Sequence, residues 1–268
     1  MIEIPCLQID AFTDRAFAGN PAAVCLLDDE REAEWMQAVA AEMNLSETAF
    51  IRPGDNGFEL RWFTPTTEVD LCGHATLASA HALWEMDVVA IGEPIHFRTK
   101  SGELICMRQG ELIELDFPAT PVTAADESEE LCGALGVTAS FVGESKFDSL
   151  VLVESEQVVR SLKPDFSRLR ELPVRAVIVT SASDNPGFDF VSRCFAPAAG
   201  IDEDPVTGSA HCALAPFWSE RLGKTEMTAF QASRRGGIVR VRVADDRVFL
   251  GGQAVTIFRG VLLDDFVV

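Results

Sequence analysis

Three short segments of the sequence carry side chains of the kinds that take part in proton transfer. Glu47 lies in LSETAF, His74 in CGHATLA, and Asp204 in EDPVTGSAH. A carboxylate and an imidazole held in a cleft can take a proton from a carbon atom and return it, provided that their pKa values lie near the working pH. The residue types alone leave simpler explanations open, namely a solvated acid at Glu47, a hydrogen-bonding residue at a helix start for His74, and a turn residue for Asp204.

Two glycines begin segments of small residues that suit the binding of an anion. Gly73 precedes His74-Ala75-Thr76, and Gly208 precedes Ser209-Ala210. If helices begin at these glycines, their first backbone N–H groups are unpaired and can bind a carboxylate or a phosphate without a cationic side chain. The same small residues are also explained by tight packing of a helix on a sheet.

The elements that must position these residues follow from an internal repeat. Residues 63–78, FTPTTEVDLCGHATLA, resemble residues 195–215, FAPAAGIDEDPVTGSAHCALA, since both run Phe-x-Pro, an acidic loop, Gly and a helix start. Similar flanking patterns of strands and one helical stretch precede each copy, and a tail of alternating apolar residues follows it. We therefore predict an α+β protein with two pseudo-symmetric domains, each a curved, barrel-like sheet around one central helix.

The domain boundaries are expected at a segment rich in Pro, Thr and acidic residues. This segment, PATPVTAADESEE, covers residues 118–130 and has the composition of a connection. We predict an N-terminal domain over residues 1–118, a linker over 119–130 and a C-terminal domain over 131–268. The final strand could instead cross back to the N-terminal domain. Ligand sites favour the interface between such domains.

Composition and charge limit the partners of the protein. The 268 residues include 22 Lys and Arg against 42 Asp and Glu, a formal net charge of −20, which repels nucleic acid and anionic membranes. The N-terminus lacks the basic and apolar regions of a signal peptide, and no apolar run reaches the length of a membrane span. We expect a cytoplasmic protein without a nucleic acid or membrane partner, with its seven cysteines as free thiols.

Metal and nucleotide sites are not expected. The pairs Cys72-x-His74 and His211-Cys212 match no standard zinc spacing, and the sequence contains neither GxGxxG nor GxxxxGK[ST]. We therefore predict no metal ion and no cofactor.

Several segments in both halves of the chain resemble the PhzF family. They are DAFTDRAFAGNPAAV (10–24), NLSETAF (44–50), the Phe-x-Pro segment that begins at residue 63, FAP (195–197) and EDPVTGSAH (203–211). This phenazine-biosynthesis-like family belongs to the superfamily with the diaminopimelate epimerase fold. The resemblance implies two barrel-like halves with the active site between them, and a homodimeric isomerase or epimerase that needs neither metal nor cofactor.

The resemblance also implies roles for individual residues. Glu47 matches the family's acid/base glutamate, and His74 and Asp204 match positions that line its pocket, so these three are the expected catalytic residues. The expected substrate-binding residues are those at the two helix starts: Gly73, Ala75, Gly208 and Ser209. The substrate itself does not carry over, beyond a small molecule that bears a carboxylate.

Two alternatives to this assignment remain open. One is a non-catalytic protein that binds a small anion at the helix starts and performs no proton chemistry. The other is a racemase or epimerase that uses Cys72, since the epimerase branch of the superfamily employs two cysteines. The second cysteine of that branch is missing here, because the matching stretch 204–208 reads DPVTG.

Overall fold

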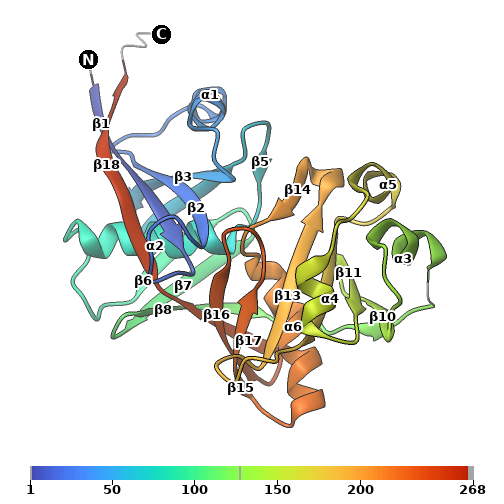
Figure 1. Ribbon diagram of the computed structural model, residues 1–268. Coiled ribbons are helices and arrows are strands. Elements are labelled where there is room, and N and C mark those ends of the chain that lie inside the picture. The colour runs from blue at the N-terminus through green and yellow to red at the C-terminus, as the bar shows by residue number, and fades with distance from the viewer. Residues whose placement is uncertain (1, 127, 265–268) are drawn as a thin grey trace. The chain divides into compact units, whose positions relative to one another are not determined.

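The computed structural model describes residues 2–126 and 128–264 (Figure 1). The chain divides into two compact units, which we call unit 1 and unit 2. Unit 1 comprises the residues up to Asp116 together with those from Gly251 onward, and unit 2 comprises Phe117–Leu250. Within the described residues, no helix is long and apolar enough to cross a lipid bilayer.

Unit 1 is built on a mixed sheet with one helix on each face. Its strands are β1 (Ile2–Ala11), β2 (Asn20–Leu26), β3 (Glu47–Gly54), β4 (Gly57–Phe63), β5 (Glu68–Val69), β6 (Ile95–Thr99), β7 (Gly102–Gln109), β8 (Leu112–Pro118) and β18 (Ala254–Asp264). The pairings run β18–β1–β2–β3–β4–β6–β7–β8, with β2–β3 and β4–β6 parallel and the others antiparallel. The helices are α1 (Ala33–Met43) and α2 (Gly73–Glu85).

Helix α2 is the central element of unit 1. Ten of its thirteen residues are buried, and it packs against β1, β2, β3 and β18. Alanines at positions 75, 78, 80 and 82 allow the strands to approach the helix closely, and a helix that is apolar on all sides belongs in a core. Helix α1 covers a second cluster of buried side chains that includes Met36, Phe50 and Phe63.

Unit 2 contributes nine strands and four α-helices among the described residues. Its strands are β9 (Thr123–Ala124), β10 (Phe141–Glu144), β11 (Asp148–Leu152), β12 (Ala176–Ala182), β13 (Phe190–Ala196), β14 (Ile201–Asp204), β15 (Glu226–Gln231), β16 (Gly237–Ala244) and β17 (Arg247–Gly252). The helices are α3 (Glu129–Leu135), α4 (Glu156–Ser161), α5 (Phe166–Glu171) and α6 (Gly208–Leu222), with a 3₁₀ turn at Pro197–Ala199. The pairings run β9–β10–β11–β12–β13–β15–β16.

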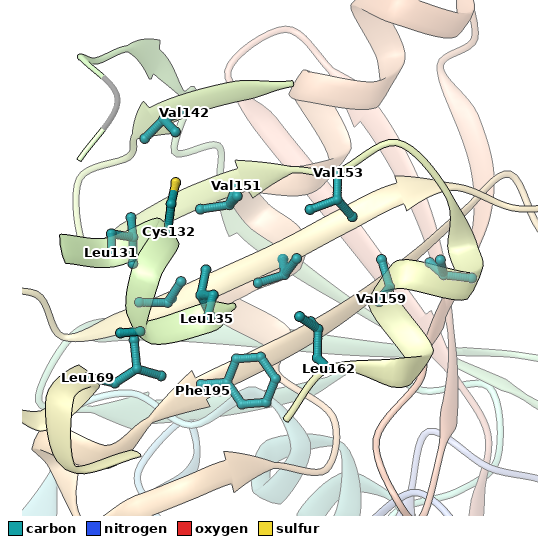
Figure 2. Close-up of a cluster of buried hydrophobic side chains, with 14 residues drawn as sticks. Leu131, Cys132, Leu135, Val142, Val151, Val153, Val159, Leu162, Leu169 and Phe195 are labelled. Atoms are coloured by element: carbon teal, nitrogen blue, oxygen red, sulfur yellow. The ribbon is translucent and has the colours of Figure 1, made fainter. Parts of the chain in front are cut away.

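The short helices α3, α4 and α5 cover one core of unit 2. Figure 2 shows side chains from these helices pointing toward side chains of the strands beneath, including Val151 and Phe195. Helix α6 packs against β15 and β16 instead, and nine of its fifteen residues are buried. Like unit 1, unit 2 therefore combines a largely buried helix with a separate layer of helices over a sheet.

The predicted repeat is visible in the register of the strands. In unit 1 the parallel pair β2–β3 leads into β4, where Phe63 lies opposite Thr48. In unit 2 the parallel pair β11–β12 leads into β13, where Phe195 lies opposite Val177. The two Phe-x-Pro segments thus end equivalent strands.

Two segments near the expected domain boundaries lie within compact units. The described residues of the segment 119–130, which was expected as a linker, lie in unit 2. Within this segment, β9 pairs with β10 and Glu129 begins α3. Residue 127 is outside the described residues. The final strand β18 belongs to unit 1, where it pairs with β1 along its whole length.

Candidate active site

The candidate site in unit 1 lies where β3 begins and α2 begins. Glu47 is the first residue of β3 and lies opposite Ala22 of the parallel strand β2. His74 is the second residue of α2, directly after the extended N-cap residue Cys72 and Gly73. Because both elements start at this point, two residues 27 positions apart in the sequence bring their side chains together.

Glu47 and His74 are in direct contact. The Glu47 Oε2 and His74 Nε2 atoms are 3.1 Å apart, and the two side chains are only 13% and 4% exposed. Neither atom has a hydrogen-bond partner of good geometry among the described residues, so the contact is a close charge pair rather than an aligned hydrogen bond. A substrate group that enters here therefore finds both atoms open to new hydrogen bonds.

The other ring nitrogen of His74 faces two further side chains. Asn20 Nδ2 lies 3.1 Å from His74 Nδ1, and Cys72 Sγ lies 3.5 Å from the same atom. Asn20 lies within the segment 10–24, and no role was predicted for it from the sequence. The sequence signal that could have identified Asn20 is Gly19 directly before it. A glycine allows a tight turn at the start of a strand, and a polar residue that follows such a turn can be buried at the strand start.

The charges of this cluster are set by burial and by the neighbouring groups. Burial raises the pKa of the Cys72 thiol, and the Glu47 carboxylate raises it further, against the weaker effects of His74 and of the Ala75 backbone N–H. Burial lowers the pKa of His74, but the nearby Cys72 and Glu47 together raise it by more, to well above its usual value. Of the two acidic groups beside the ring, Glu47 lies nearer to Nε2 and Cys72 nearer to Nδ1.

The three ionisable side chains lie close together. Their donor atoms in Glu47, Cys72 and His74 lie within 4.8 Å of one another, a span that suits a metal ion. Glu47 contacts Nε2 whereas Cys72 contacts Nδ1, so the two groups approach different nitrogens of the ring.

The residues expected at the start of α2 are placed for backbone contacts. Gly73 is half-buried, and Ala75 is fully buried, so Ala75 can offer a ligand only its backbone. The N-cap residue Cys72 makes no side-chain cap hydrogen bond of good geometry, although the Ala75 backbone N–H lies near enough to its thiol to lower the thiol pKa.

Unit 2 holds the remaining expected residues. Asp204 ends β14, and its Oδ2 atom accepts a hydrogen bond from the Thr207 hydroxyl at 2.6 Å. Gly208 begins α6, whose start also has no side-chain cap. The hydroxyl of Ser209 accepts a hydrogen bond from Arg175 Nη2 at 3.1 Å, so the structure groups these three residues at one helix start.

Sequence reasoning missed Arg175, the cation at this helix start. Its guanidinium donates two hydrogen bonds to the carboxylate of Asp148, at 2.8 and 2.7 Å, in addition to the bond to Ser209. Burial lowers its pKa, but the Asp148 carboxylate raises it by more, so Arg175 remains charged. Its partners Asp148 and Ser209 lie 27 and 34 residues away in the sequence, and no local motif predicts these contacts.

Comparison with known proteins places the chain in a family. The family model described as phenazine biosynthesis-like protein, PhzC-PhzF, matches residues 9–260. A relative from Halalkalibacterium halodurans, named an uncharacterized isomerase, is 54% identical over 264 residues, with 98% of this chain and 100% of the relative covered.

Solved structures show the same fold. The PhzF-family phenazine biosynthesis protein of Enterococcus faecalis is 40% identical and superposes with a TM-score of 0.94, with 98% of this chain and all of that chain covered. A Pseudomonas aeruginosa protein described as a predicted epimerase is 23% identical, with a TM-score of 0.78 over 98% of this chain and 100% of that chain, and shows likeness of fold alone. The expected fold of two epimerase-like halves is confirmed.

Proposed function

The chain belongs to the PhzC-PhzF, or phenazine biosynthesis-like, family, and from this premise we propose that it is an isomerase that moves a proton within a small carboxylate-bearing metabolite. Glu47 is the proposed general acid/base. The observation that carries the proposal is the contact between Glu47 Oε2 and His74 Nε2 at 3.1 Å in a nearly buried site. The name of the Halalkalibacterium halodurans relative, an isomerase, supports the same reaction class.

The proposed reaction needs only a proton acceptor and groups that stabilise charge. The Glu47 carboxylate takes a proton from a carbon atom next to an electron-withdrawing group and returns it to the same or a neighbouring atom. His74, with its raised pKa, donates a hydrogen bond to the negative charge that develops on the substrate. Such a step requires no metal ion and no organic cofactor.

The substrate carboxylate needs its own binding groups on a protein with a net charge of −20. We propose, as the anion-binding groups of each unit, the backbone N–H groups at its buried helix: Gly73 and Ala75 at the start of α2 in unit 1, and Gly208 and Ser209 at the start of α6 in unit 2. The absence of a side-chain cap at both helix starts supports this assignment. Asp204, held by the Thr207 hydroxyl, is proposed to act in the same reaction.

A substrate search in two stages tests the proposal. A panel of small amino and unsaturated carboxylic acids is first screened for binding by thermal shift, and the compounds that bind are incubated with the protein in D₂O. Proton transfer through a carboxylate that exchanges with solvent predicts deuterium at carbon, detected by mass spectrometry. Saturable binding with no exchange would instead identify a non-catalytic anion-binding protein.

Substitution of Glu47 tests the assignment of the acid/base residue. Glu47→Gln keeps the size of the side chain but removes the proton acceptor, and it should lower the exchange rate about 10²- to 10⁴-fold. Glu103→Gln is the matched control, because the Glu103 side chain is 62% exposed and contacts only His96 among the contacts described. Undiminished exchange in Glu47→Gln would show that another group is the base.

A further inference from the structure

We propose that Asn20 is a positioning residue for the Glu47–His74 pair, whose side-chain amide binds Nδ1 of His74 and so keeps the proton of the neutral ring on Nε2, the nitrogen that lies beside Glu47. The inference rests on the proposed function, because it gives Asn20 a role in the proton chemistry of that site. The contact that carries it joins Asn20 Nδ2 and His74 Nδ1 at 3.1 Å, between two buried side chains 54 residues apart.

The backbone around Asn20 fixes the amide in place. Asn20 is the first residue of β2, is 0% exposed, and lies opposite Ala11 of β1. Gly19 has a φ of +64°, and a Cβ atom there would lie 2.1 Å from the Ala11 carbonyl oxygen, so only glycine permits this turn. The amide therefore has little freedom to leave the imidazole.

The two contacts of the imidazole determine where its proton lies. An amide NH₂ group can only donate, so Nδ1 must accept, and the proton of a neutral ring must then be on Nε2. That atom is 3.1 Å from Glu47 Oε2. Asn20 thus selects the form of His74 that presents an N–H group, rather than a lone pair, to the reacting site.

The Nδ1–H tautomer would instead need an acceptor at this position, and the atom of Asn20 that faces Nδ1 is the amide nitrogen, which donates. An aspartate at this position can only accept when ionised, and a leucine can do neither. The titratable groups that face His74 are Glu47 from β3 and Cys72 from the N-cap of α2, and the weakly donating Cys72 thiol is the rival partner for Nδ1.

NMR of the imidazole nitrogens tests the inference without any substrate. The chain has four histidines, so long-range ¹H–¹⁵N spectra of labelled protein resolve each ring once His74 is assigned from a His74→Asn variant. Spectra recorded from about pH 5 to about pH 10 cover both states of a histidine with a raised pKa. Wild-type His74 should be the Nε2–H tautomer when neutral, and an Nδ1–H tautomer would overturn the inference.

Substitutions at Asn20 separate its role from the packing of the core. Asn20→Leu should lower the ratio of Nε2–H to Nδ1–H tautomer about fivefold, the equivalent of one net hydrogen bond. Asn20→Asp should raise the pKa of His74 by about one unit or more. Thr48→Val is the matched control, since Thr48 is equally buried in β3 and its hydroxyl has no hydrogen-bond partner among the described residues.

The outcomes distinguish this inference from the proposed function. An unchanged tautomer ratio in Asn20→Leu together with an unchanged His74 pKa in Asn20→Asp would refute the positioning role. If one variant fails to fold, the other still decides the question, and an Nδ1–H tautomer in the wild-type protein refutes the role in either case. A failure of the D₂O exchange experiment would refute the isomerase while leaving the result for Asn20 intact.

Discussion

His211 in α6 should make the stability of unit 2 depend on pH. The side chain is 0% exposed, and its Nδ1–H group donates to the Thr207 carbonyl at 2.8 Å, while Nε2 has no partner among the described residues. Burial lowers the pKa of His211 to about 4, against a smaller opposing effect of the Thr207 carbonyl. Between about pH 6.5 and pH 4, His211 therefore binds a proton in the unfolded chain but not in the folded protein.

The size of the effect follows from the two pKa values. Above the unfolded value of about 6.5 the ring is neutral in both states and contributes nothing. Between 6.5 and 4 only the unfolded state gains the proton, so stability is lost as the pH falls through this window. The loss amounts to about 2 kcal/mol at about pH 5 and about 3 kcal/mol once the pH is below 4.

Urea unfolding of the wild type and of His211→Asn measures this contribution. An asparagine can keep the donation to the Thr207 carbonyl but does not titrate, so the difference in unfolding free energy between the two proteins isolates His211. That difference should shift by about 2 kcal/mol between about pH 7.5 and about pH 5, in the direction that favours the variant at low pH. His96→Asn, at a side chain that is 41% exposed, should follow the wild type.

A difference between wild type and His211→Asn that stays constant with pH, within about 0.5 kcal/mol, would refute the reasoning. Carboxylates and His74 also titrate, but they do so in both proteins and cancel in the comparison. Hydrogen exchange of the α6 amides, followed by mass spectrometry, would confirm that the change in free energy belongs to unit 2.

Two further predictions concern stability. Gly252→Ala should cost about 1–3 kcal/mol in urea unfolding, because the new Cβ would lie 2.4 Å from Phe12 Cδ1 and 3.0 Å from Leu77 Cδ1 in a packed core. Asp165→Ala should cost about 1 kcal/mol by the same assay, since the Asp165 side chain caps α5 through the N–H groups of Ser167 and Arg168; Asp165→Asn, which keeps the cap, should cost little.

The repeat made the architecture predictable from the sequence. Phe63 is the last residue of β4 and Phe195 the last but one of β13, each in a strand that follows a parallel pair, and Gly73 and Gly208 each begin a largely buried helix. These features follow from local patterns, namely the spacing of apolar residues and the glycines at helix starts. Because the patterns occur in both halves of the chain, the prediction for one half supports the prediction for the other. The resemblance to the PhzF family implied one pocket for Glu47 and His74, and the structure brings their side chains to 3.1 Å.

The partners of the site residues could not be predicted in the same way. Asn20 reaches His74 across 54 residues, and Arg175 reaches Ser209 across 34. Asparagine after glycine is ordinary turn chemistry, and an arginine before a strand is an ordinary surface residue. The roles of Asn20 and Arg175 depend on how deeply each side chain is buried and on which helix starts beside it. The sequence patterns do not give either of these directly.

The charges of the site favour the carboxylate over the thiol as the working base. A thiol-based racemase requires Cys72 as a thiolate, since the thiolate is the form that accepts a proton. Burial and the Glu47 carboxylate both raise the pKa of Cys72, so the thiolate is scarce at neutral pH. Any gain of negative charge at Cys72 would also place two anions beside one buried imidazole, a cost that the Glu47–His74 pair alone avoids. The contact of Cys72 Sγ with His74 Nδ1 at 3.5 Å is then that of a thiol beside the ring, which agrees with the proposal that Glu47 is the base.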